Sequence, residues 1–192
     1  MTSLNLRLAQ NATLATPRLL LRKVHLSDAN DLFEYASDQM TVRYVSFPRH
    51  QTVVDSQEAI ANHFMPNTLQ TWGIIWQETG KFIGTISLMS LDEHQAELGY
   101  ILNRTFWGQG VMPEAASALL KLCFEVLGLT QVHALHHVDN PASGRVMQKI
   151  GMQRIGTFPD YKREFSNLTG KVESITAEQW IITKDMYFKQ HK

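Results

Sequence analysis

A glycine-rich turn in the middle of the chain has residue types and a spacing suited to binding an anion. The segment Phe106 to Ala115 reads FWGQGVMPEA, and Gly108 and Gly110 come directly before an apolar helical pattern. At a helix start, backbone N–H groups and the positive end of the helix dipole favour a phosphate. A Walker loop is excluded because no Lys followed by Ser or Thr comes after the second glycine, and a dinucleotide fingerprint is disfavoured because Pro113 stands where a small residue is needed. Two glycines alone also fit a plain strand-to-helix turn.

The elements that must position this turn follow from the periodicity of apolar residues. The segments Thr71–Gln77, Lys81–Leu88 and Ala96–Leu102 have strand character, with short turns between them, and predict an antiparallel meander. The segment Pro113–Leu127 has apolar residues at helical spacing, with Pro113 suited to the first helical position and Gly128 to the stop.

The rest of the chain alternates between strand and helix patterns without repeats or linkers. The further predicted elements are strands Arg18–Leu26, Gln131–Val138, Met152–Phe158 and Ile175–Thr183, and helices Ser27–Asp38, Asp55–Phe64 and Ala142–Ile150. This order predicts a mixed α/β or α+β fold with a largely antiparallel sheet.

Composition limits the classes of function. A length of 192 residues predicts a single domain, 1–192. With 18 basic and 18 acidic residues the formal net charge is zero, which argues against direct nucleic-acid binding. The longest apolar stretch, Ala118–Leu129, is shorter than the ~20 residues of a membrane span, so no membrane association is expected. A single cysteine, Cys123, and the absence of a signal-peptide pattern predict a cytoplasmic protein.

Clustered histidines do not predict a metal site. His136 and His137 are neighbours on a strand and point to opposite faces, whereas His133 and His137 share a face but lie about 13 Å apart at ~3.3 Å per residue. We therefore predict no metal. Cys123 lies on the apolar face of its helix and is expected to be a buried core residue.

Several short motifs occur together in an order that resembles one superfamily. The chain resembles the GNAT-superfamily N-acetyltransferases, and within them the ribosomal-protein alanine and serine N-acetyltransferases (RimJ/RimL-like). The motifs are Thr16-Pro17-Arg18-Leu19, Phe82-Ile83-Gly84, Glu97-Leu98-Gly99-Tyr100, Trp107-Gly108-Gln109-Gly110 with Glu114-Ala115, Asn140-Pro141-Ala142-Ser143 and Lys149-Ile150-Gly151-Met152. They span about residues 16–183.

The resemblance implies a fold and a cofactor site. The expected GNAT fold has a parallel, splayed strand pair that holds acetyl-CoA, and about four flanking helices. Acetyl-CoA would be bound by the main chain of the glycine turn, by the strand backbone, and by residues of the helix that follows the second strand of the pair. The expected contacts are Leu98, Tyr100, Gly108, Gln109, Gly110, Val111, Met112, Asn140, Ser143 and, facing the phosphates, Lys149.

Acetyl transfer from a thioester to an amine needs a neutral amine, oxyanion stabilisation and a proton for the thiolate. Glu97 is the first candidate for the base, directly or through water, with the nearby His94 as an alternative; Glu97 also fits an ordinary strand residue. A main-chain N–H near Gly99 or Tyr100 is the expected oxyanion donor. Many superfamily members have a tyrosine that gives a proton to the leaving thiolate, and this chain has Met147 at that position. Ser143 is therefore the expected proton donor.

The acceptor amine stays open between several classes. A protein N-terminal α-amine is preferred, because its pKa of ~8 leaves on the order of a tenth neutral at pH 7. A small-molecule amine differs only in the acceptor groove, which is expected from Leu32 to Pro66 and Asp160 to Gly170. Met147 motivates a third hypothesis, a non-catalytic acyl-CoA-binding module. The resemblance is also compatible with a homodimer.

Overall fold

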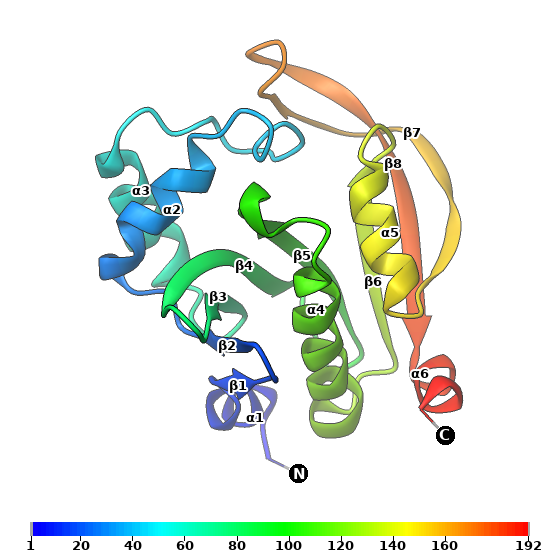
Figure 1. Ribbon diagram of the computed structural model, residues 1–192. Helices are drawn as coiled ribbons and strands as arrows, with labels where there is room; N and C mark the ends of the chain where they lie inside the picture. The colour runs from blue at the N-terminus through cyan, green and yellow to red at the C-terminus, as the bar shows by residue number, and fades with distance from the viewer. Residues whose placement is uncertain (1, 192) are drawn as a thin grey trace.

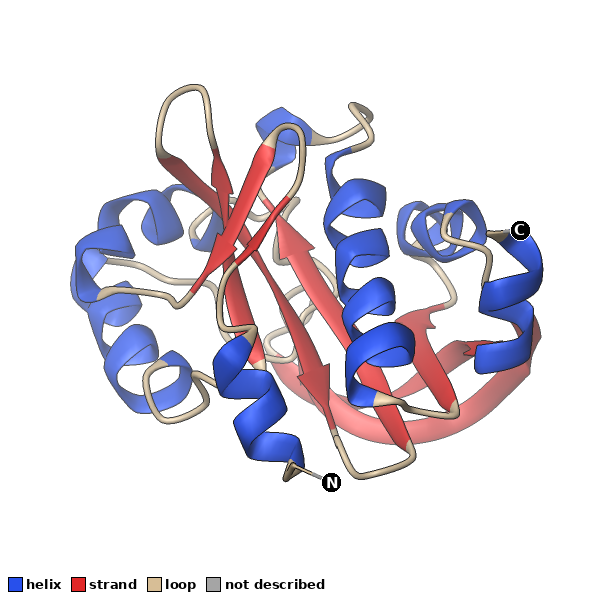
Figure 2. Cartoon of the chain, turned by 90° about the horizontal axis from the view of Figure 1, so that it is seen from below, coloured by secondary structure: helices blue, strands red, loops and turns tan. Residues whose placement is uncertain are grey.

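The computed structural model describes residues 2–191 and contains one eight-stranded sheet with helices on both faces (Figures 1 and 2). The strands are β1 (Leu14–Ala15), β2 (Leu19–Arg22), β3 (Thr71–Trp76), β4 (Lys81–Met89), β5 (Gln95–Leu102), β6 (Gln131–His137), β7 (Gln153–Ser166) and β8 (Lys171–Thr183). The α-helices are α1 (Leu4–Gln10), α2 (Ala29–Ala36), α3 (Val53–Ala59), α4 (Val111–Lys121), α5 (Pro141–Lys149) and α6 (Lys184–Gln190). The predicted mixed α/β fold is confirmed.

The strands lie in the order β1-β2-β3-β4-β5-β6-β8-β7. Every neighbouring pair is antiparallel except β5 and β6. The predicted meander of β3, β4 and β5 forms the middle of the sheet. Within it, a Cβ at Gly84 would collide with the carbonyl oxygen of Ile101, which explains why the Phe82-Ile83-Gly84 motif ends in glycine.

The parallel pair of β5 and β6 is splayed, as the resemblance implies. Gln95–Glu97 pair with Gln131–His133. In the described part of the chain, the two strands are not paired beyond these residues, although β5 continues to Leu102 and β6 to His137. In Figure 1 the two strands diverge toward the end where α4 and α5 begin.

Apolar residues cover both faces of the sheet. The larger core lies under α4 and α5 and includes Leu119 and Val132, whereas a second core under α2 and α3 includes Leu32 and Phe82. Cys123 is fully buried in the larger core, and burial raises the pKa of its thiol to about 12, so the predicted structural role of this cysteine is confirmed.

The structure corrects three expectations. Six α-helices are present among residues 2–191 instead of about four, because the short α1 and α6 carry too few turns for a clear amphipathic pattern. Helix α4 begins at Val111, so Pro113 is its third residue and not its first; a proline fits there because first-turn N–H groups have no intrahelical acceptor. The strands β7 and β8 are longer than predicted, since most of β7 is exposed and shows no apolar alternation.

No helix among residues 2–191 has the length and apolar character to cross a membrane.

Candidate functional site

The turn before α4 has the backbone geometry of an anion site. Gly108 and Gly110 have φ angles of 74° and 75°, in the left-handed region that favours glycine. The N–H of Glu114 donates to the Gly110 carbonyl at 3.1 Å as the first hydrogen bond of the helix. The N–H groups of Val111 and Met112 therefore have no intrahelical acceptor, and the turn can present them to a phosphate.

A clamp from the N-terminal segment fixes this turn. The Glu114 carboxylate accepts hydrogen bonds from the Thr16 hydroxyl at 2.6 Å, from the Arg18 backbone N–H at 3.0 Å and from Arg18 Nε at 2.7 Å. Arg18 Nη1 also donates to the Gln109 carbonyl at 3.0 Å. Burial raises the pKa of Glu114, but the hydrogen bonds from Thr16 and Arg18 outweigh it, so the pKa lies below its ordinary value. These residues lie in two of the sequence motifs, but the contact between the two motifs was not predicted, because they are almost 100 residues apart in the chain.

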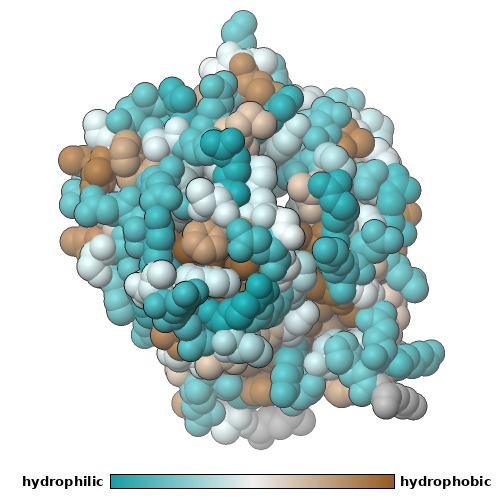
Figure 3. Space-filling model, viewed as in Figure 1, coloured by the Kyte–Doolittle hydropathy of each residue, from teal (hydrophilic) through white to brown (hydrophobic). Residues whose placement is uncertain are grey.

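The splayed edge of β5 offers main-chain groups to a ligand. The His94 carbonyl accepts hydrogen bonds from the N–H groups of Thr130 and Gln131, so the peptide groups of His94 face β6. Peptide direction alternates along a strand, which turns the N–H and C=O groups of Leu98 and Tyr100 toward the same edge. The surface is hollowed between α4 and α5, with apolar residues in the hollow (Figure 3). The pantetheine arm of acetyl-CoA is long and thin, and its amide groups can both donate and accept hydrogen bonds at such a strand edge.

Two hydroxyl groups bridge from β5 to α5. Ser143 Oγ donates to the Tyr100 hydroxyl oxygen at 2.9 Å, and the Tyr100 hydroxyl donates to the Ser143 carbonyl at 3.0 Å. Burial raises the pKa of Tyr100, so the phenol stays protonated. Asn140 caps α5, its Oδ1 accepting from the Ser143 N–H at 3.4 Å. Met147 is buried in the core. The Tyr100 side chain was missed from the sequence because only the fold brings it to Ser143.

Glu97 lies at the point where β5 and β6 separate. Its partner in the parallel register is His133, and Glu97 Oε2 is 3.6 Å from His133 Nε2. His133 lowers the pKa of Glu97 against the opposing effect of burial, and Lys162 contributes in the same direction. Glu97 is therefore an ionised carboxylate at neutral pH. The alternative base, His94, is exposed in the turn before β5.

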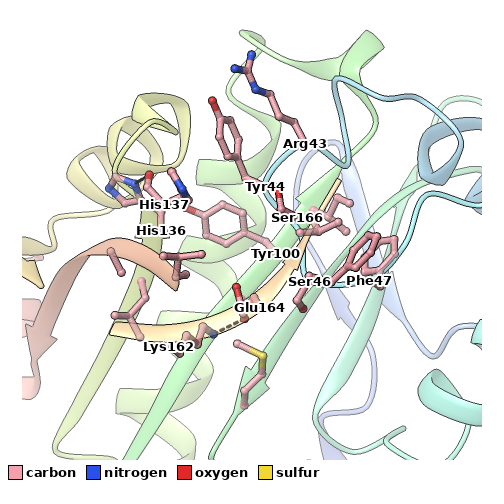
Figure 4. Close-up of a pocket in the computed structure, with 18 of the residues that line it drawn as sticks. Arg43, Tyr44, Ser46, Phe47, Tyr100, His136, His137, Lys162, Glu164 and Ser166 are labelled. Atoms are coloured by element: carbon pink, nitrogen blue, oxygen red, sulfur yellow. Dashed lines mark hydrogen bonds and ion pairs between the residues drawn. The ribbon is translucent and has the colours of Figure 1, made fainter. Parts of the chain in front are cut away.

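A cavity of about 780 Å³ lies against the face of the sheet that carries Glu97 (Figure 4). Its floor is formed by β4 and β5, and its walls by the loop between α2 and α3 and by the β7–β8 hairpin. Side chains that line it, and are labelled in Figure 4, include Tyr44, Phe47, Tyr100, Lys162 and Glu164. The two stretches from which the acceptor groove was expected thus supply part of the cavity walls, whereas the floor comes from the sheet.

Lys149 is not brought together with the other predicted cofactor contacts. It is the last residue of α5 and lines a separate cavity of about 270 Å³, together with Ser117 and Leu120 from later turns of α4. The glycine turn lies at the first turn of α4. The predicted contact between Lys149 and the cofactor phosphates therefore finds no support in this arrangement.

Comparisons with known proteins agree with this geometry. A sequence profile described as an acetyltransferase (GNAT) domain matches residues 18–153. The chain is 33% identical over 159 residues to the uncharacterized N-acetyltransferase p20 of Bacillus licheniformis, over 79% of this chain and 88% of that protein. It is similar to the crystal structure of a GNAT-family acetyltransferase from Bacillus anthracis, with a TM-score of 0.78 and 26% identity, over 90% of this chain and 99% of that one.

A ribosomal-protein-S5-alanine acetyltransferase from Vibrio fischeri shares the fold, with a TM-score of 0.73 and 17% identity, over 91% of this chain and 98% of that one. At this identity the likeness extends to the fold alone. The profile match covers more than half of the chain, and the matched motifs include the glycine turn and the β5 strand. The chain therefore belongs to the GNAT acetyltransferase family and is an acetyl-CoA-dependent N-acetyltransferase.

Proposed function

We propose that the protein transfers the acetyl group to a protein N-terminal α-amine, of the ribosomal-protein type, by direct attack of the amine on the thioester. The observation that carries this proposal is the length of the cavity floor. Thr85, Ser87 and Met89 on β4 line the cavity, and their register partners on β5 run from Ile101 back to Glu97. Four residue steps span about 13 Å at ~3.3 Å each, enough for about four residues of an extended peptide. A chain end fits this space with its amine at Glu97.

The main chain would hold acetyl-CoA. In this proposal the N–H groups of Gly108, Gln109, Gly110, Val111 and Met112 bind the pyrophosphate, and the open edge of β5 binds the pantetheine arm through Leu98 and Tyr100. This arrangement brings the thioester to the hydroxyl pair of Tyr100 and Ser143. Asn140 contributes by fixing the first turn of α5, on which Ser143 lies.

Glu97 is the proposed proton acceptor. The amine nitrogen forms a bond to the acetyl carbonyl carbon and becomes more acidic as it does so, which allows a carboxylate of low pKa to take the proton. His133 Nε2 lies 3.6 Å from the carboxylate, at the point where the two strands separate. The main-chain N–H of Tyr100, next to Gly99, faces the open edge of β5 and is the proposed donor to the oxyanion.

The hydroxyl pair is the proposed proton source for the leaving group. When the carbon–sulfur bond breaks, Ser143 Oγ gives its proton to the thiolate and takes one back from solvent, and Tyr100 orients that hydroxyl. The pair supplies a donor that Met147 cannot supply, which weakens the hypothesis of a non-catalytic acyl-CoA-binding module. A small-molecule amine acceptor would use the same groups but leave most of the cavity floor uncovered.

A direct test uses purified protein, acetyl-CoA and a panel of acceptors. The panel contains tetrapeptides with free N-termini, the same peptides with blocked N-termini and an internal lysine, and linear polyamines. Thiol release and peptide mass are followed together. We expect release and a gain of one acetyl group only with free N-termini. Turnover of polyamines but not peptides would replace the proposed acceptor, and binding of CoA without thiol release from any acceptor would support the binding module. Light scattering of the same preparation tests the homodimer.

A further inference from the structure

The side chain of Asn167 joins two segments that are distant in sequence. Asn167 follows β7 at the tip of the β7–β8 hairpin. Its Nδ2 donates to the carbonyls of Val42 and Phe47, both at 2.9 Å, and to that of Val45 at 3.3 Å. Its Oδ1 accepts from the N–H of Arg49 at 2.9 Å. All four partners are backbone groups of one segment, residues 37–52, which we call the α2–α3 loop.

An asparagine is the residue type that this contact requires. A side-chain amide carries two N–H donors beside a carbonyl acceptor, whereas a carboxylate of the same shape only accepts. A half-buried asparagine at a hairpin tip would ordinarily be satisfied by solvent or by its own turn. Here the donors and the acceptor of Asn167 are all directed at the α2–α3 loop.

The α2–α3 loop and the tip of the β7–β8 hairpin both form walls of the cavity of about 780 Å³, where the acceptor is proposed to bind. Val45, Ser46 and Phe47 of the α2–α3 loop line it, and so do Ser166 and Leu168, which flank Asn167. The loop has a second attachment at Tyr44, whose ring stacks on His137 at the end of β6 with a centroid distance of 5.2 Å (Figure 4). The loop is thus held over the cavity from two sides.

We propose that Asn167 is an acceptor-positioning residue, which preorganises the α2–α3 loop as the wall against which the acceptor chain lies beyond its amine. This inference rests on the proposed function and deepens it. The acceptor it implies is an amine at the end of an extended chain several residues long. A fixed wall lowers the ordering cost of binding such a chain, because the loop is already in its bound conformation. A single amino-acid amide offers the same amine but does not reach along the cavity.

The test compares Asn167→Ala and Asn167→Asp with a matched control, Asn11→Ala. Asn11 also donates to a backbone carbonyl, that of Arg7 at 2.8 Å, but it caps α1, away from the cavity. The acceptors are a tetrapeptide amide and alaninamide. Three quantities are measured: KM and kcat for each acceptor, the Kd for acetyl-CoA, and the rate of tryptic cleavage after the exposed Arg49.

We expect both Asn167 variants to be cleaved faster after Arg49 than the wild type or Asn11→Ala. We expect the KM for the tetrapeptide to rise about 10-fold, equivalent to ~1.4 kcal/mol. The KM for alaninamide, kcat at saturation and the Kd for acetyl-CoA should stay within about 2-fold. The aspartate variant guards against an effect of lost packing, because it keeps the size of the side chain and removes its donors.

An unchanged KM for the tetrapeptide in an active Asn167→Ala variant would overturn this inference and leave the proposed function standing. An equal rise of KM for alaninamide would also overturn it, since the effect would then lie at the amine. Unchanged tryptic cleavage would show that Asn167 does not hold the loop. A wild-type protein that acetylates no peptide N-terminus would overturn the proposed function, and this inference with it.

Discussion

Replacing Glu114 with glutamine removes the charge that joins the N-terminal segment to the glycine turn before α4. Glutamine keeps the size of the side chain and one acceptor oxygen. It loses the negative charge that pairs with Arg18, whose Nε lies 2.7 Å from Glu114 Oε2. Because Arg18 also holds the Gln109 carbonyl, a looser clamp should disturb the turn that presents Val111 and Met112.

The expected loss of stability follows from the three hydrogen bonds to the carboxylate. Hydrogen bonds to charged groups contribute ~1.5–3 kcal/mol each. The Arg18 side chain is 39% exposed, so solvent screens its part, and the glutamine oxygen retains some of the bonding. We expect the free energy of unfolding at pH 7 to fall by ~1–2 kcal/mol, which corresponds to a Tm lower by roughly 3–6 °C for a chain of this length. The Kd for acetyl-CoA should rise by roughly 3-fold to 10-fold.

The pH dependence identifies the charge as the cause. The pKa of Glu114 in the folded protein lies below the ordinary value of 4.5. A carboxyl group with a lowered folded pKa stabilises the protein fully above its unfolded pKa, and this contribution is lost as pH falls through the folded pKa. The Tm difference between wild type and Glu114→Gln should therefore be full at pH 6–7 and shrink as pH falls below about 4.5.

Thermal unfolding between pH 3 and 7 measures this difference, and calorimetry measures acetyl-CoA binding. Glu93→Gln is the matched control, because Glu93 pairs with Arg7 at 3.2 Å but its side chain is 64% exposed. That variant should change Tm little at any pH, as exposed ion pairs contribute little. A Tm difference for Glu114→Gln that is absent, or that stays constant down to pH 3, would refute the charged clamp.

Further substitutions test the two halves of the proposed site. Gly110→Asp should raise the Kd for acetyl-CoA at least about 10-fold, because it adds a side chain at a φ of 75° and a negative charge at the proposed phosphate site. An unchanged Kd would remove the turn from the cofactor site. Gly80→Asp, at a φ of 73° in the β3–β4 turn, is the control. Tyr100→Phe and Ser143→Ala should each lower kcat by about 10-fold to 100-fold, and the double variant should lose no more than the larger single loss, because the two hydroxyls act as a unit. Additive losses would show separate roles.

The parts of the fold that depend on local pattern could be predicted from the sequence. The meander from Thr71 to Leu102 and the helix after Gly110 have strong periodicity and clear turn residues, and both are present. The ends of β7 could not be predicted, since most of its residues are exposed and the strand therefore shows no alternation of apolar and polar residues. The start of α4 was placed two residues late because a proline is most common at the first helical position but is tolerated elsewhere in the first turn.

The candidate site also has parts that could be predicted from local sequence and parts that could not. Main-chain groups such as those of Gly110 and Leu98 lie in motifs whose local geometry can be predicted. The contacts of Arg18 with Glu114, of Tyr100 with Ser143, and of Asn167 with the α2–α3 loop join residues far apart in the chain. The periodicity of apolar residues along the sequence does not indicate which distant side chains are in contact. Such contacts depend on the register and twist of the sheet, which a single sequence does not specify.

The role of Glu97 in taking the proton from an N-terminal amine is tested most directly by a pH–rate profile. The measurement is kcat/KM for a tetrapeptide from pH 5.5 to 10, for the wild type, Glu97→Gln and the control Glu93→Gln. Because the pKa of Glu97 lies below 4.5, the carboxylate is ionised throughout, and the rise of the rate with pH belongs to the amine. We predict that Glu97→Gln is about 100-fold slower at pH 7 and recovers partly above pH 9, where hydroxide can take the proton from the attacking nitrogen in place of the carboxylate. A Glu97→Gln profile that overlays the wild type would contradict the account.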